Sequence, residues 1–241
     1  MTESSFDRRD FLNISAAATA GVALAAPAAA MAQAAAPVAP AGPLYFPQPA
    51  ALLFDPKSIT GLSEKLLTSH HDNNYVGAVK RLGAIDGQLA GLDPATAPGF
   101  LLNGLKREQL IAWNSMVLHE IYFSCLGSPS KPGMALSSAI ERDFGSEARW
   151  RVEFTAMGKA LGGGSGWVVL TRSARDGRLV NQWAADHTMA LAGGTPIVVL
   201  DMFEHAYAMD YGAKAAAYVD AVVATLNWSA ADARFAGAER K

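Results

Sequence analysis

Two stretches of this sequence place a histidine within the apolar face of a predicted helix. Residues 58–89 follow a helical pattern in which leucines four and eight residues before His70 share its face. Residues 108–126 form a second predicted helix, one face of which carries His119 and no charged side chain. That face consists of Ala112, Ser115, Met116, His119, Tyr122, Phe123 and Leu126. Two helices that each turn a histidine inward are expected to pack as an antiparallel hairpin.

The pattern changes after residue 130, where helices are joined by short strand-like runs. Helices are predicted at residues 135–144 and 146–161, strands at 167–171, 179–183 and 197–200, and a final helix from 203 to near 228. The predicted fold class is α+β. It comprises an N-terminal antiparallel helical hairpin domain at residues 53–130 and a C-terminal α/β domain at residues 131–241 with a small three-stranded antiparallel sheet.

The first fifty residues are not expected to belong to this fold. Arg8-Arg9 opens a twin-arginine pattern followed by an apolar stretch and small residues, so residues 1–32 are predicted to be a cleaved signal peptide. A membrane anchor is the weaker interpretation, because the run is short and is interrupted by Gly and Pro. Residues 33–52, rich in Ala and Pro, are interpreted as an extended tether. The twin-arginine route exports folded proteins, so we expect a periplasmic protein with no membrane contact after signal cleavage.

Charge and cysteine content argue against several classes of protein. The chain has 20 Lys and Arg against 22 Asp and Glu, so nothing favours nucleic acid or an anionic membrane as a partner. Cys125 is the only cysteine, which rules out an intrachain disulfide. The glycine-rich run at 162–167 lacks the Gly-Lys-Ser/Thr ending of a phosphate loop.

Two histidines and an Asp-x-x-x-His pattern together indicate a metal site. Asp201 precedes His205 by four residues at a predicted junction of strand and helix. Each histidine, taken alone, is more often a hydrogen-bonded core residue than a metal ligand. Three neutral imidazoles and one carboxylate suit a first-row transition metal, whereas calcium and magnesium prefer oxygen ligands. A structural zinc site usually contains several cysteines, and this chain has one.

The same residues carry a resemblance to a known family. The run Asp201-Met202-Phe203-Glu204-His205-Ala206-Tyr207 resembles the Asp-x-Trp-Glu-His-Ala-Tyr signature of iron/manganese superoxide dismutases. Further segments that match the family's order and spacing are 63–70, 119–126, 144–146, 164–167, 195–196 and 227–228. The resemblance extends over about residues 55 to 235.

The resemblance implies a metal centre and a reaction. The implied ligands are His70, His119, Asp201 and His205, with a solvent molecule as fifth ligand and one iron or manganese ion per chain. The implied reaction converts superoxide to oxygen and hydrogen peroxide. A homodimer is also implied, because in the family the residue at Glu204 reaches the ligand histidine of the other subunit across a two-fold axis.

The residues around the implied ligands depart from the family's usual pattern. Most members hydrogen-bond the solvent ligand with a glutamine, and here we expect His187 to take that role, since Ser115 stands at the alternative place. Trp167 and Phe203 are expected to line the metal pocket, although Phe203 replaces a tryptophan. Asn74 stands where the family has a histidine beside its gateway tyrosine.

Losses of other family residues keep a second interpretation open. The gateway tyrosine aligns with Ala78, the tyrosine after the signature aligns with Ala208, and the usual Arg-Pro has become Ala215-Ala216. Tyr75 lies about 100° round the helix from Asn74 and is a poor substitute for the lost tyrosine. The alternative is a metal-binding relative with little or no dismutase activity. A third interpretation, a helical binding module without metal, requires the four implied ligands to be coincidental.

Overall fold

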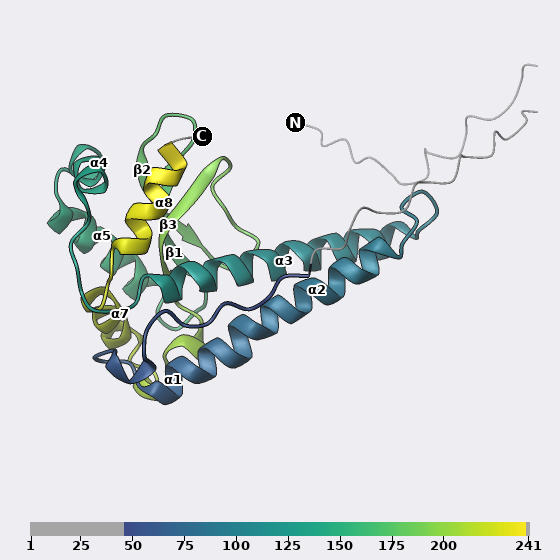
Figure 1. The fold of residues 1–241 in the computed structure, drawn as a ribbon, viewed down its shortest axis with the longest axis horizontal. Coiled ribbons are helices and arrows are strands. Elements are labelled where there is room, and N and C mark those ends of the chain that lie inside the picture. The colour runs from purple at the N-terminus through teal and green to yellow at the C-terminus, as the bar shows by residue number, and fades with distance from the viewer. Residues whose placement is uncertain (1–45, 240–241) are drawn as a thin grey trace, which may run out of the picture. The chain divides into compact units, whose positions relative to one another are not determined.

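The computed structural model describes residues 46–239 (Figure 1). The predicted signal peptide and residues 33–45 of the predicted tether lie outside the described residues. The first part of the described chain is helical. Its elements are a 3-10 turn at Pro56–Ser58, α1 at Glu64–Ser69, a π-helical segment at His70–Tyr75, α2 at Val76–Ala90 and α3 at Gly99–Ser124. Helices α2 and α3 form the expected antiparallel hairpin.

The first helix begins later than the pattern predicted. Residues 59–63 are not helical, because Gly61 takes a positive φ of 87° and Ser63 caps the next helix. The Ser63 hydroxyl accepts a hydrogen bond from the Leu66 backbone N–H at 3.1 Å, which satisfies one of the exposed donors at the start of α1. The prediction of one continuous helix from residue 58 was therefore wrong at its start.

Helix α3 begins nine residues before its predicted start. Its first part is largely exposed, with Phe100 83% accessible, so no apolar periodicity marks it in the sequence. Polar contacts to α2 begin only at the predicted start, where Arg81 pairs with Glu108 and Gln109 donates to Asp86. Apolar periodicity located the buried part of the helix and missed its solvent-exposed extension.

The C-terminal part contains the predicted three-stranded sheet. Helices α4 (Met134–Phe144) and α5 (Glu147–Ala160) precede strands β1 (Trp167–Ser173), β2 (Leu179–Ala184) and β3 (Gly194–Asp201). The strand order is β2-β1-β3 and both pairings are antiparallel. On the central strand, Trp167 pairs with Ala184 on one side and with Asp201 on the other. The predicted fold class is confirmed.

The predicted final helix is broken into shorter pieces, and a last helix was missed. The pieces are a 3-10 turn at Glu204–Ala206, α6 at Ala208–Tyr211 and α7 at Ala215–Ala224. The missed helix is α8 at Ser229–Glu239. Gly212 takes a positive φ of 53° and ends α6. Between α7 and α8 the chain becomes extended, where Leu226 pairs with Leu126. Asn227 then accepts a hydrogen bond from the Ser229 N–H and so helps start α8.

One hydrophobic core joins the hairpin to the C-terminal part. Helix α3 packs against β3, α8 packs against the same strand, and α5 packs against α7. Trp150, Trp167 and Trp228 are fully buried in this core. The division into domains at residue 130 stays a prediction. None of the helices between residues 46 and 239 is both long and apolar enough to cross a membrane.

Gly166 fixes the entry of β1 into the site. Its φ is 136°, and a Cβ atom there would lie 2.1 Å from the backbone oxygen of Ala184. The Gly166 carbonyl also accepts a hydrogen bond from the Met202 N–H at 2.9 Å. The backbone therefore approaches too closely for any side chain at this position.

Replacing Gly166→Ala should destabilise the protein by about 3 kcal/mol, because it adds a backbone clash to a strained φ. The control is Gly163→Ala, where φ is also positive at 85° but no atom lies within 4 Å of the added Cβ. That variant should lose only about 1 kcal/mol. Denaturant unfolding measures both values, and equal losses would show that the approach to Ala184 does not matter.

Candidate metal centre

Three histidine side chains converge on one buried carboxylate oxygen. The Oδ2 atom of Asp201 lies 3.1 Å from Nε2 of His70, 3.4 Å from Nε2 of His119 and 3.3 Å from Nε2 of His205. Nε2 of His119 and Nε2 of His205 are 3.5 Å apart. The carboxylate, His70 and His119 are buried, and the His205 side chain is 28% exposed. The structure thus brings together all four predicted ligands.

Four separate elements supply these side chains. His70 begins the π-helical segment, His119 lies in α3, Asp201 ends β3, and His205 lies on the 3-10 turn that follows. A π-helical turn inserts an irregularity into a helix and is frequent at functional sites.

Hydrogen bonds behind the cluster orient its members. The Phe203 N–H donates to Oδ1 of Asp201 at 2.8 Å, which leaves Oδ2 directed at the histidines. Nδ1 of His119 lies 2.6 Å from the Ser115 carbonyl oxygen, so it carries the proton and Nε2 keeps its lone pair. Nδ1 of His70 is buried and has no hydrogen-bond partner within residues 46–239.

The protonation states suit metal binding. Burial lowers the pKa of His119 to about 3 and also lowers the pKa of His70, so both imidazoles are neutral near pH 7. Burial alone would raise the pKa of Asp201, but hydrogen bonds from His205 and His70 hold it below its usual range. Neutral imidazoles and an ionised carboxylate are the forms that bind a metal ion.

The separations between these atoms also fit a metal ion. Ligands about 2.1 Å from one ion, at angles between 90° and 110°, lie about 3.0–3.5 Å from one another. The Asp201–His and His119–His205 separations of 3.1–3.5 Å agree with that range. A set of three nitrogens and one oxygen suits iron or manganese better than calcium or magnesium.

His187 lies beside the cluster with a defined tautomer. The Trp167 indole N–H donates to Nδ1 of His187 at 3.0 Å, so the neutral ring carries its proton on Nε2. Burial lowers the pKa of His187, which favours this neutral form. Its ring lies 6.4 Å from the His119 ring and stacks on Phe203 at 4.7 Å. His187 is therefore placed to donate a hydrogen bond from Nε2.

Trp167 and Phe203 form walls of the same site. The Trp167 ring meets the His119 ring edge to face at 5.1 Å, and the Phe203 ring stacks on the His205 ring at 5.5 Å. Both walls are aromatic, so water has limited access to the histidine rings from these sides.

A cavity of about 290 Å³ opens beside His187. Asn74, Ala78, Ser115 and His187 line it, and Arg81 is the only permanently charged side chain among its lining residues. Ala78, one of these lining residues, is the position that the resemblance aligns with the gateway tyrosine. Asn74 lines the same cavity as His187, and its role beside the metal centre stays a prediction.

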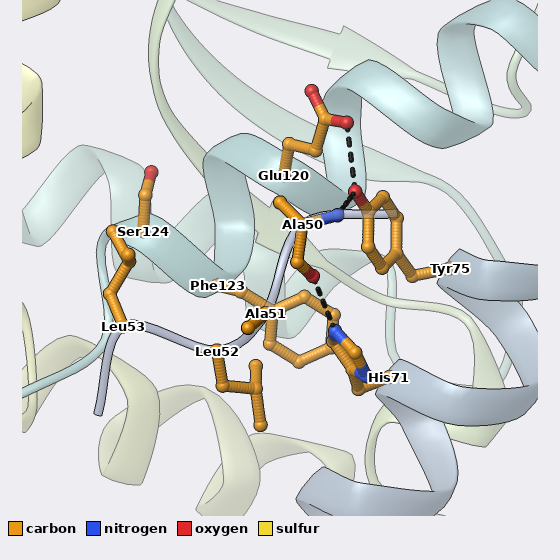
Figure 2. Close-up of a pocket in the computed structure, with 9 residues that line it drawn as sticks. All are labelled: Ala50, Ala51, Leu52, Leu53, His71, Tyr75, Glu120, Phe123 and Ser124. Atoms are coloured by element: carbon orange, nitrogen blue, oxygen red, sulfur yellow. Dashed lines mark hydrogen bonds between the residues drawn. The ribbon is translucent and has the colours of Figure 1, made fainter. Parts of the chain in front are cut away.

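The Tyr75 hydroxyl points toward Ala50 and Glu120, as Figure 2 shows. It donates to Oε1 of Glu120 at 2.9 Å, and Tyr75 is not among the lining residues of the cavity at His187. The sequence-based judgement that Tyr75 does not replace the missing tyrosine agrees with this position.

Sequence reasoning missed Tyr218, which forms a hydrogen bond to the backbone of Asp201. Its hydroxyl donates to the Asp201 carbonyl oxygen at 2.8 Å and lies 3.2 Å from the Tyr122 hydroxyl. Tyr218 is fully buried on α7. A lone tyrosine in an apolar helix gave no signal in the sequence, because its partner is a backbone atom of a distant strand.

Comparisons with known proteins agree with this arrangement. Residues 132–234 match the family described as iron/manganese superoxide dismutases, C-terminal domain. A protein of Cupriavidus metallidurans named as an iron superoxide dismutase is 67% identical over 186 residues, which cover 77% of this chain and 94% of that protein. An iron superoxide dismutase of Aquifex pyrophilus is 32% identical over 188 residues, 75% of this chain and 87% of its own. A manganese superoxide dismutase of Halobacterium salinarum is 32% identical over 178 residues, 72% of this chain and 86% of its own.

Proposed function

Because this chain belongs to the iron/manganese superoxide dismutase family, we propose that it converts superoxide to oxygen and hydrogen peroxide at a mononuclear iron or manganese centre. One ion per chain is held by His70, His119, Asp201 and His205. The observation that carries this proposal is the convergence of three imidazole Nε2 atoms on Oδ2 of Asp201.

The chemistry divides between the bound metal and the protein. Iron or manganese supplies one-electron chemistry, by which one superoxide is oxidised to oxygen and a second, with two protons, is reduced to hydrogen peroxide. The Asp201 carboxylate favours the higher oxidation state of the metal, and the neutral imidazoles moderate that preference. His187 holds a proton on Nε2 at the edge of the site, and Trp167 keeps it there.

The cavity beside His187 is the proposed entry route for superoxide. It is roomy for a diatomic anion, and the Arg81 guanidinium gives it a favourable charge. Ala78 and Asn74 leave no side-chain relay on its wall, so protons for the second half-reaction come from water in this cavity. The same substitutions support the alternative, a metal-binding relative with little dismutase activity.

The first test compares the wild-type protein with His70→Ala. The wild type should contain about one iron or manganese ion per chain and dismutate superoxide rapidly. The variant should lose the metal, and activity should fall by at least about 100-fold, because a ligand is gone. Elemental analysis and rapid superoxide decay measure the two quantities on the same sample.

His187→Ala is the matched comparison, because all four proposed ligands remain. It should keep its metal while activity falls about 10- to 100-fold. A wild type with full metal and negligible dismutation would establish the alternative, and a wild type that binds no metal would contradict both proposals.

The proposal includes a homodimer. Glu204 is exposed in the single chain and has no ion-pair partner within residues 46–239. It precedes His205, whose side chain is the only partly exposed one of the four proposed ligands. A reciprocal contact from Glu204 to the partner's His205 would cover both groups, and two-fold symmetry makes this contact twice.

Glu204→Ala should therefore shift the protein from dimer toward monomer at micromolar concentration, since two contacts are lost per dimer. The control, Glu153→Ala, removes a carboxylate that accepts from Asn181 within the same chain, and it should remain dimeric. Analytical ultracentrifugation distinguishes the outcomes. A wild-type monomer would contradict the proposal directly.

The proposal also places the protein in the periplasm, exported by the twin-arginine route. Arg8-Arg9 and the apolar stretch after it support this location. A metal centre that must be loaded before export is a common reason for this route.

Replacing both Arg8→Lys and Arg9→Lys should retain the protein in the cytoplasm with residues 1–32 uncleaved. Cell fractionation and the mass of the purified chain report this result. Periplasmic delivery of the double variant would contradict the assigned route.

A further inference from the structure

Segment 46–53 crosses the hairpin on the side shown in Figure 2, and two side chains, Tyr75 and His71, hold its backbone at Ala50. The Ala50 N–H donates to the Tyr75 hydroxyl at 2.7 Å, and Nε2 of His71 lies 2.9 Å from the Ala50 carbonyl oxygen. The Tyr75 hydroxyl in turn donates to Glu120. We call His71, Tyr75 and Glu120 the clamp.

The clamp joins the two helical turns that carry proposed ligands. His71 follows His70 in the chain, and Glu120 follows His119. Tyr75 ends the π-helical segment that His70 begins, so its bond to Glu120 links that segment to α3. Ala50 of segment 46–53 bonds to both His71 and Tyr75 and so ties the segment to this link.

Phe123 lies between the clamp and the ligand rings. Its ring is 5.7 Å from His71 and 6.4 Å from Tyr75 on the clamp side. The same ring is 4.9 Å from His70 and 6.4 Å from His119. Because packed interiors transmit small displacements, loosening the clamp shifts the support behind both imidazoles.

Segment 46–53 is attached by these hydrogen bonds and by the partly buried Leu52 side chain, which packs against the core. Phe46 is 57% exposed and Leu53 82% exposed, and a cavity of about 90 Å³ remains beside the segment. Tyr75 is 1% exposed, so a lost partner would leave a buried hydroxyl or carboxylate unsatisfied. Loosening the clamp therefore weakens the docking of the segment.

We propose that Tyr75 is a positioning residue for the metal centre and that the clamp couples docking of segment 46–53 to metal binding. This inference rests on the proposed function, since it requires a metal at His70 and His119. Coupling is reciprocal: if docking strengthens metal binding, metal binding strengthens docking by the same factor. The segment belongs mostly to the predicted tether, so metal loading also orders the attachment of that tether to the fold.

The test measures metal release from the metal-loaded, full-length chain into excess chelator. Tyr75→Phe removes the bonds to Ala50 and Glu120, and Ala50→Pro removes only the Ala50 N–H donor. Both should release metal about five- to tenfold faster than wild type. Glu120→Gln keeps an oxygen acceptor for the Tyr75 hydroxyl and should release metal at nearly the wild-type rate.

The control for general destabilisation is Ser146→Ala, which removes the cap of α5 far from the clamp in sequence. It should lower stability without faster metal release. Electron paramagnetic resonance of the bound metal adds a readout of ligand geometry. Its rhombicity should change in Tyr75→Phe and stay unchanged in Ser146→Ala.

Hydrogen exchange at the Ala50 amide tests the reverse direction of the coupling. Removing the metal from the wild type should accelerate exchange at Ala50 more than at Trp150 in α5. Metal release from Tyr75→Phe no faster than from Ser146→Ala would overturn the inference while leaving dismutase function intact. A metal-free wild type would overturn the proposed function as well, and elemental analysis identifies that case first.

Discussion

The fold is organised around a buried carboxylate, Asp201, which needs hydrogen-bond partners to stay ionised. Asp201 is fully inaccessible to solvent, and an unpaired ionised group in such a place costs several kcal/mol. Three imidazoles and the Phe203 N–H surround its two oxygens, and Tyr218 holds its backbone. Asp201 and its imidazole partners come from four elements that must meet: the π-helical segment, α3, the end of β3 and the turn after β3. The tertiary structure therefore depends on the same contacts that form the metal centre.

Periodicity and motif spacing predicted the hairpin, the three strands and the four converging side chains. These features are local, since an apolar face or a five-residue pattern carries them. The start of α3 escaped prediction because its first residues are largely exposed, and the break at Gly212 escaped because backbone conformation determines it. Tyr218 and the Tyr75–Glu120 bond escaped for another reason: each joins residues 17 or more positions apart, and neither partner is unusual in its own helix.

The departures from the family pattern concentrate on one side of the centre. Ala78 and Asn74 line a cavity there together with His187, whose orientation is set by the Trp167 indole N–H. A histidine held by an indole N–H has one tautomer and one donor direction, whereas a glutamine can present either end of its amide. The protein thus combines an open cavity beside the centre with a hydrogen-bond donor of defined direction.

The register between β1 and β3 decides whether the Asp201 carboxylate reaches the metal centre. Trp167 on the central strand faces Asp201 across the β1–β3 pair, and both enter the same pocket. A shift of one residue in this pairing would reverse the faces of β3 and turn the Asp201 carboxylate away from the histidines. A chain with a misaligned strand would then lack the fourth ligand however well its helices had formed. Retention of the metal therefore reports that β1 and β3 are correctly aligned, independently of any measurement of catalysis.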